Sequence, residues 1–100
     1  MFEWDEAKSQ RNLLQRGFNF AFAAMIFDGP ILEMDDPRAG YSERRVQAIG
    51  RAGGYILFIV YTWRVDVRRI ISARKANRRE RDVYREIFSR KSAQPGESQS

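Results

Sequence analysis

The chain has 100 residues, of which 43% are hydrophobic, and its formal net charge is +5. This length predicts a single domain with a modest core. The sequence contains no cysteine and no histidine. It therefore excludes disulfides and thiolate metal sites, and it excludes histidine as a metal ligand or as a general base near neutral pH. We expect neither a metal ion nor another cofactor.

The charge is unevenly distributed along the chain. Residues 1–43 hold four basic and eight acidic side chains, and residues 44–100 hold fourteen basic and five acidic ones. This asymmetry predicts that the second half faces a polyanion. The acidic start does not resemble a signal peptide, and the longest apolar run, Tyr55 to Trp63, is much shorter than the roughly 20 residues of a membrane span. We therefore predict a soluble cytoplasmic protein without a membrane partner.

The first elements are predicted to be a short strand and a helix. Residues 2–4 alternate in the manner of an edge strand. Asp5 is a suitable N-cap for a helix that runs to about Arg16 and ends at Gly17, since glycine commonly follows the last helical residue.

A second helix is predicted over residues 20–27, with Asn19 as its N-cap and Asp28-Gly29-Pro30 at its end. It is apolar nearly all round, which indicates either complete burial or partial cover by a partner. One interpretation is a plain core helix. The other is a helix with one face on the sheet and the rest at a partner interface, for which the candidate residues are Phe20, Phe22, Met25 and Ile26.

The middle of the chain predicts strands joined by tight turns. Gly53-Gly54 is typical of a two-residue hairpin turn, and Arg64-Val65-Asp66 forms the next tight connection. Short connections make neighbouring strands antiparallel. The predicted strands cover residues 31–34, 45–51 and 55–63, and a last one begins at Val67.

The last helix is predicted to begin after Asn77, where Glu80 completes a capping box. Apolar pairs at i,i+4 spacing (Val83 with Ile87, Tyr84 with Phe88) give its core face. We expect the helix to fade near Lys91 and residues 92–100 to be disordered, which leaves one domain over residues 1–91. The order predicts an α+β fold in which two N-terminal helices and a C-terminal helix pack on one antiparallel sheet.

Cations surround the start of this last helix. Its first turn is basic, although the helix dipole favours acids there. A bound anion would relieve the repulsion among these cations and with the helix dipole, and the geometry of arginine suits a phosphate. The alternative is that the arginines only keep a solvated face soluble. The cations are Arg68, Arg69, Arg74 and Lys75 on the strand and Arg78 and Arg79 on the helix.

Several short motifs occur in order over roughly residues 2–85. They are Phe2-Glu3-Trp4-Asp5 with Lys8, Asn12 and Gly17; Glu43-Arg44-Arg45 with Ile49-Gly50; and Arg69-Ile70-Ile71-Ser72-Ala73-Arg74 with Ala76, Glu80 and Tyr84. At this spacing the chain resembles the BrnT family of toxins, within the RelE/ParE-like group of type II toxin–antitoxin systems. At two positions where that family usually has histidine, this chain has Arg16 and Tyr41.

The resemblance implies a RelE-like fold and a ribonuclease that cleaves mRNA, with or without the ribosome, so that translation is inhibited and growth is arrested. It also implies a BrnA-like antitoxin as partner, which covers the toxin. Promoter DNA would be reached only through that antitoxin.

Metal-independent cleavage requires the RNA 2′-OH to attack the adjacent phosphorus, with stabilisation of the developing charge and proton transfer at both oxygens. Arginine stays protonated, so it can only stabilise charge and position phosphate. Glu80, Tyr84 and Lys75 are the candidate bases, although Glu80 also fits a capping box and Tyr84 a core stripe. The candidate catalytic residues are Arg64, Arg74, Lys75, Arg78, Glu80 and Tyr84, and the candidate RNA-binding residues are Lys8, Arg68, Arg69 and Arg79.

Strand alternation predicts that Arg68 and Arg74 lie on one face of their strand and Arg69 on the other. The residues also leave an alternative function open, a non-catalytic RelE/ParE-like protein that binds a protein target or RNA without cleaving it. The arginine constellation separates the two functions, because only an RNA-cleaving protein needs phosphate geometry around Arg64 and Arg74.

Overall fold

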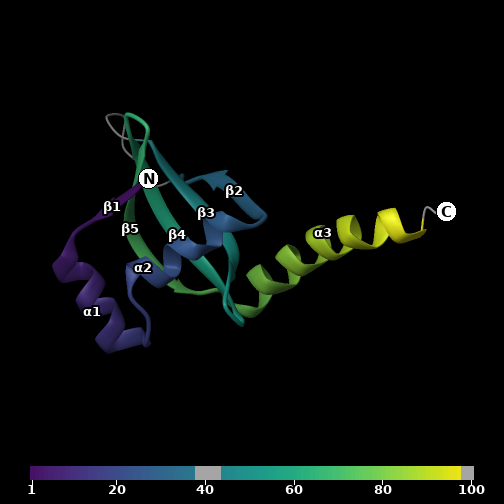
Figure 1. The fold of residues 1–100 in the computed structure, drawn as a ribbon, viewed down its shortest axis with the longest axis horizontal. Helices are drawn as coiled ribbons and strands as arrows, with labels where there is room; N and C mark the ends of the chain where they lie inside the picture. The colour runs from purple at the N-terminus through teal and green to yellow at the C-terminus, as the bar shows by residue number, and fades with distance from the viewer. Residues whose placement is uncertain (38–43, 98–100) are drawn as a thin grey trace.

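The fold is α+β, with one five-stranded sheet in the order β1-β5-β4-β3-β2. In the computed structural model, residues 1–37 and 44–97 are described, with side chains as far as residue 89. Figure 1 shows the two N-terminal helices beside the sheet and α3 projecting away from it. The elements are β1 (Phe2–Trp4), α1 (Glu6–Arg16), α2 (Phe20–Ala23), the 3₁₀ helix η1 (Ala24–Asp28), β2 (Ile31–Asp35), β3 (Arg45–Ala52), β4 (Tyr55–Arg64), β5 (Val67–Lys75) and α3 (Arg78–Glu97).

The predicted fold class is confirmed, with three differences in detail. The sheet is mixed, because β1 pairs in parallel with β5, and alternation within a strand carries no information on the direction of a neighbour so distant in sequence. The second helix is α-helical only over its first four residues and then tightens to a 3₁₀ helix. The third difference is that α3 continues past Lys91 to Glu97, since a nucleated helix propagates at little cost. The domain limits at residues 1–91 stay a prediction.

The predicted helix ends are confirmed by their caps. The Asp5 carboxylate accepts from the backbone N–H of Ala7 at 2.9 Å and of Lys8 at 3.3 Å, which satisfies two of the free donors of α1. Gly17 has φ of 89° and donates to the Leu13 carbonyl at 3.0 Å. This left-handed conformation suits glycine, so the chain turns sharply here toward α2.

One face of the sheet, which we call the covered face, packs against α1, α2 and η1. Gly50 of β3 allows this close approach, because a Cβ there would lie 2.7 Å from the Cβ of Ile26. The buried side chains include Phe18, Phe20, Ile26, Leu57, Ile59, Tyr61, Ile70 and Ala73.

The other face, which we call the open face, carries only a small core beneath the first turns of α3. Tyr84 and Phe88 pack there against the sheet. Beyond them α3 runs away from the body of the molecule (Figure 1). The remainder of the open face is not covered by a helix among the described residues, and its side chains Gln47, Arg69 and Ser72 are half-buried or exposed. The core residues of this face are Ile49, Ile56, Phe58, Val60, Ala76 and Tyr84.

A β-bulge in β5 decides which arginines reach the open face. Val60 pairs with Ser72, but the next residue, Tyr61, pairs with Ile70, so Ile71 is an extra residue that reverses the alternation. Ile70 and Ala73 therefore both face the covered core. The prediction that Arg68 and Arg74 share a face is wrong: Arg68 lies on the covered face, whereas Arg74 and Arg69 lie on the open face.

Candidate active site on the open face

Three adjacent rows of side chains cross the middle of the open face, as the strand register defines them. The two outer rows carry arginine, and the middle row is uncharged. The first row holds Leu32, Ile49, Phe58 and Arg74; the middle row holds Met34, Gln47, Val60 and Ser72; the far row holds Arg45, Thr62, Arg69 and Glu3.

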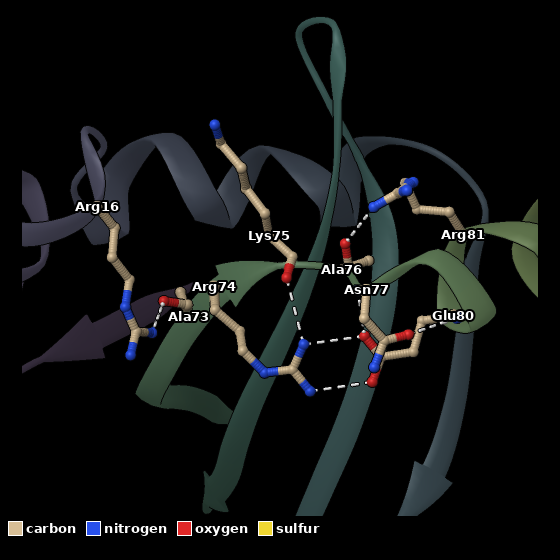
Figure 2. Close-up of polar contacts among 8 residues, drawn as sticks. All are labelled: Arg16, Ala73, Arg74, Lys75, Ala76, Asn77, Glu80 and Arg81. Carbon is tan, nitrogen blue, oxygen red and sulfur yellow. Dashed lines mark hydrogen bonds and ion pairs between the residues drawn. The ribbon is translucent and has the colours of Figure 1, made fainter.

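Arg74, in the first row, is held by the carboxylate of Glu80 from the start of α3. Its two terminal nitrogens donate to the two Glu80 oxygens, each at 2.9 Å. One of the same nitrogens also donates to the Lys75 carbonyl at 3.2 Å. Figure 2 shows this two-pronged contact between the end of β5 and α3. The guanidinium also lies 4.0 Å above the Phe58 ring, so its plane is fixed by contacts on two sides.

The same carboxylate closes the predicted capping box. Glu80 accepts from the Asn77 N–H at 2.8 Å, and the Asn77 side chain accepts from the Glu80 N–H at 2.8 Å. Hydrogen bonds from Arg74 hold the pKa of Glu80 below its usual value, with a further contribution from Asn77. Glu80 is therefore ionised at neutral pH and acts as an acceptor, so it is a poor proton-accepting base.

The pairing with Glu80 leaves one edge of Arg74 unused. A guanidinium has five N–H donors in a fixed plane, and the contacts above occupy the end of the fork. The side edge, formed by Nε and the second proton of Nη2, has no partner among the described residues. This edge can donate two hydrogen bonds to a phosphate in the side-on bidentate geometry that arginine favours.

Arg16, which was not among the predicted site residues, lies beside this edge. It extends from the last turn of α1 and donates to the Ala73 carbonyl of β5 at 2.8 Å (Figure 2). With Arg74 and Glu80 it borders a cavity of about 440 Å³, which we call the Arg74 pocket; its lining residues are Arg16, Gln47, Phe58, Val60, Ser72, Arg74 and Glu80. The sequence contains only a weak indication that Arg16 belongs to the site, namely a basic residue before Gly17. Nothing in the local sequence shows that the end of α1 lies against β5.

Three of the predicted catalytic residues lie away from the Arg74 pocket. Lys75 points to the opposite side of β5 (Figure 2), with its ammonium 4.7 Å above the Tyr55 ring. Arg78 is exposed and forms an ion pair with Asp82 at 3.9 Å. Tyr84 is buried and donates to the Pro30 carbonyl at 2.7 Å; burial raises the pKa of its phenol. These positions suit structural roles better than proton transfer at the pocket.

The remaining predicted catalytic residue, Arg64, lies at the far end of the open face with Arg69. Both donate to one carboxylate oxygen of Glu3, at 3.4 and 3.0 Å respectively. About 13 Å separates the far row from the first row along the strands, since Thr62 lies four positions after Phe58 in β4 at roughly 3.3 Å per position. Arg64 and Arg74 therefore do not converge on one phosphate.

The other predicted RNA-binding residues are dispersed. Arg68 is on the covered face, where its guanidinium lies 4.3 Å from the Phe27 ring centroid and 4.7 Å from that of Trp63. Lys8 is exposed on α1. Arg79 is exposed at the rim of a second groove next to the Arg74 pocket, which Leu32, Met34 and Val83 also line.

The predicted partner interface is only partly accessible. Phe20 and Ile26 are 2% and 0% exposed within the chain's own core, because η1 packs directly on β3. Met25 is 44% exposed, and Phe22 is half-buried against Phe18 and Tyr55. Tyr41, the other position where the BrnT resemblance leads us to expect histidine, lies outside the described residues, as does Glu43.

Within residues 1–37 and 44–97, no three acidic side chains gather as a metal ion would require. No helix in that part of the chain is long and apolar enough to cross a membrane.

The fold and the Arg74 pocket define a class of protein: a small α+β domain that presents a positioned arginine beside a cavity on an open sheet face. Residues 4–80 match the model of the ribonuclease toxin, BrnT, of type II toxin–antitoxin systems, and the chain belongs to that family. It is therefore an endoribonuclease toxin, and the family implies an RNA substrate and a cognate antitoxin. No curated protein matches the chain.

Proposed function

We propose that this toxin cleaves mRNA without a metal ion at the Arg74 pocket. The observation that carries the proposal is the geometry of Arg74, whose fork is held end-on by Glu80 while its side edge faces an open cavity. A pre-oriented donor of this kind stabilises negative charge at no cost of reorganisation when the charge develops. The BrnT match supports the reaction class.

In the proposed reaction, the scissile phosphate is bound by the side edge of Arg74. The RNA 2′ oxygen forms a bond to phosphorus as the bond to the 5′ oxygen breaks. The proton of the 2′ hydroxyl goes to solvent, and a proton from water goes to the leaving oxygen. Arg74, with Arg16 beside it, stabilises the added charge on the phosphorane oxygens.

Glu80 is assigned a positioning role in this mechanism. Its three accepted hydrogen bonds occupy three of its roughly four acceptor sites, and its lowered pKa disfavours proton uptake. Gln47 and Ser72 from the middle row lie in the same pocket and are placed to donate to the RNA. Arg78, Lys75 and Tyr84 have no direct role at the phosphate in this proposal.

The biological setting follows from the family. We infer that expression halts translation and growth, that the protein acts in the cytoplasm where mRNA is translated, and that a BrnA-like antitoxin neutralises it by covering the open face. Promoter DNA would be bound by the antitoxin and not by this chain.

The test is cleavage of a defined mRNA by purified, antitoxin-free protein in the presence of EDTA, with and without ribosomes. Cleavage by the wild type, and its loss in Arg74→Ala, would support the proposal. The matched control is Arg11→Ala, which removes an exposed arginine from α1. Intact RNA under both conditions, with growth arrest on expression, would instead favour a non-catalytic protein that binds a protein target.

A further inference from the structure

A second cationic cluster lies at the far end of the open face. We call it the Glu3 cluster and define it as Arg69 and Glu3 of the far row with Arg64, two positions beyond Thr62. Strand register brings the three together: Glu3 of β1 pairs with Arg69 of β5, and Arg69 pairs with Thr62 of β4, two residues before Arg64. Phe2 and Trp4 contact Phe27 and Phe20 on the covered face. Glu3, between them, therefore points to the open face.

The Glu3 cluster has more positive charge than its carboxylate can balance. Two guanidiniums share one Glu3 oxygen. The side chains of Arg64, Arg69 and Glu3 are 60%, 35% and 38% exposed. Ion pairs at such exposure are weak and are exchanged readily for another anion. Each guanidinium contacts Glu3 through a single terminal nitrogen, so most of its donors are available to a phosphate.

The surface between the two arginine sites suits a nucleic-acid strand. The middle row, which separates them, consists of Met34, Gln47, Val60 and Ser72 and carries no charge. A strand that crosses from Arg74 to the Glu3 cluster therefore meets no carboxylate in that row. The two sites lie about 13 Å apart along the strands, at roughly 3.3 Å per residue, which is too far for one phosphate to contact both.

We propose that the Glu3 cluster is an anchoring site for a second backbone phosphate of the RNA, distinct from the scissile phosphate at Arg74. This inference rests on the proposed cleavage at the Arg74 pocket and adds the path of the substrate to it. Arg64 and Arg69 are then binding residues, and Glu3 is a competitor that RNA displaces. The toxin would prefer RNA long enough to span both sites over a substrate with a single phosphodiester.

The first experiment measures binding without cleavage. A 2′-O-methyl oligonucleotide of roughly ten nucleotides, within the range of single-strand site sizes, lacks the attacking hydroxyl and reports affinity alone. Loss of this phosphate contact in Arg64→Ala/Arg69→Ala should weaken binding and reduce the slope of log affinity against log salt by about 0.7, the value for one neutralised phosphate on a single strand. Arg11→Ala/Arg85→Ala, which makes the same change in net charge at exposed arginines of α1 and α3, is the matched control. Equal slopes in the two double variants would overturn the proposal.

A second variant keeps the test valid if the double variant folds poorly. Glu3→Gln removes the competing carboxylate while it retains both arginines, so it should tighten binding of the same oligonucleotide severalfold. Unchanged or weaker binding by folded Glu3→Gln would argue against the anchoring site. The two results have opposite signs, and a general loss of structure cannot produce both.

Kinetics distinguish failure of the anchor from failure of the proposed function. For a long RNA the double variant should raise KM about tenfold and leave kcat nearly unchanged, whereas cleavage of a dinucleoside monophosphate should be unaffected. Equal loss on both substrates would place Arg64 and Arg69 in the chemistry and contradict an anchoring role. If the wild type does not cleave RNA but the variants show the predicted salt slopes, the proposed cleavage is contradicted and the anchoring site is still supported.

Discussion

Arg68 and Arg74 lie on the same strand, six positions apart, and meet opposite surroundings. Arg68 is on the covered face, where aromatic rings of η1 and β4 enclose its guanidinium. Arg74 is on the open face, where one carboxylate holds it at one end and a cavity borders its other edge. The first arrangement uses the arginine as a packing element, and the second leaves donors for a ligand. The difference originates in a single extra residue, the bulge at Ile71.

The largest effect is expected from Arg74→Ala, which should lower ribonuclease activity at least 100-fold, the usual cost of losing a donor aimed at developing charge. Arg74→Lys should recover only part of the loss, because an ammonium cannot form the side-on fork. Initial rates on one defined RNA measure both. Arg78→Ala removes an exposed arginine four residues away and should retain activity. Equal losses in Arg78→Ala and Arg74→Ala would mean that only the general charge of this region matters.

Arg16→Ala should reduce activity about tenfold, since a second charge beside the phosphate adds less than the donor that is already oriented. The same initial-rate assay measures the effect, and Gln15→Ala, the exposed neighbour in α1, is the control. Arg16→His tests whether the residue type expected from the family restores or exceeds the activity. Full activity in Arg16→Ala would remove Arg16 from the site and leave Arg74 as the principal charge.

The Arg68→Leu substitution tests whether Arg68 serves packing on the covered face and not RNA binding. Loss of the aromatic contacts should lower the free energy of unfolding by about 1 kcal/mol, while RNA cleavage by the folded protein stays within twofold of wild type. Urea denaturation measures the first quantity and initial rates the second. A stable Arg68→Leu protein without activity would show that the covered face takes part in RNA binding after all.

These contrasts also show how much the sequence predicted. The caps at Asp5 and Gly17 and the capping box at Asn77 and Glu80 depend on residues a few positions apart, and local rules found them. The α+β order followed from turn residues and apolar runs. The site depends on longer relations that no local pattern reports. The bulge moved Arg74 to the open face, and the end of α1 brought Arg16 to β5 across 57 positions of sequence.

Contacts between residues distant in sequence also decided which of the predicted site residues are buried. From the sequence Tyr84 fits a core stripe better than a base, and its burial and its contact with the Pro30 carbonyl agree with the core position. Phe20 and Ile26 fit a core helix somewhat better than a partner interface, and both are buried in a core where η1 approaches β3 closely at Gly50. Sequence reasoning supplied the residue types that phosphate chemistry needs. Tertiary packing decided which of them face a ligand.

The smallest effect concerns the pH dependence of the Glu80 contact. The pKa of Glu80 is lowered in the folded state, chiefly by Arg74. Its contribution to stability is therefore fully present above the unfolded pKa, near 4.3, and is lost as the pH falls through the folded value. The free energy of unfolding of the wild type should consequently fall more steeply than that of Glu80→Gln as the solution is acidified below about pH 5. Arg74→Ala, which removes the cause of the shift, should behave like Glu80→Gln. The opposite outcome is that the free energy of unfolding of Arg74→Ala, measured by urea denaturation, falls with acid as steeply as that of the wild type. The ionised form of Glu80 would then be stabilised mainly by the helix terminus and Asn77, and its interaction with Arg74 would be weaker than the two 2.9 Å hydrogen bonds indicate.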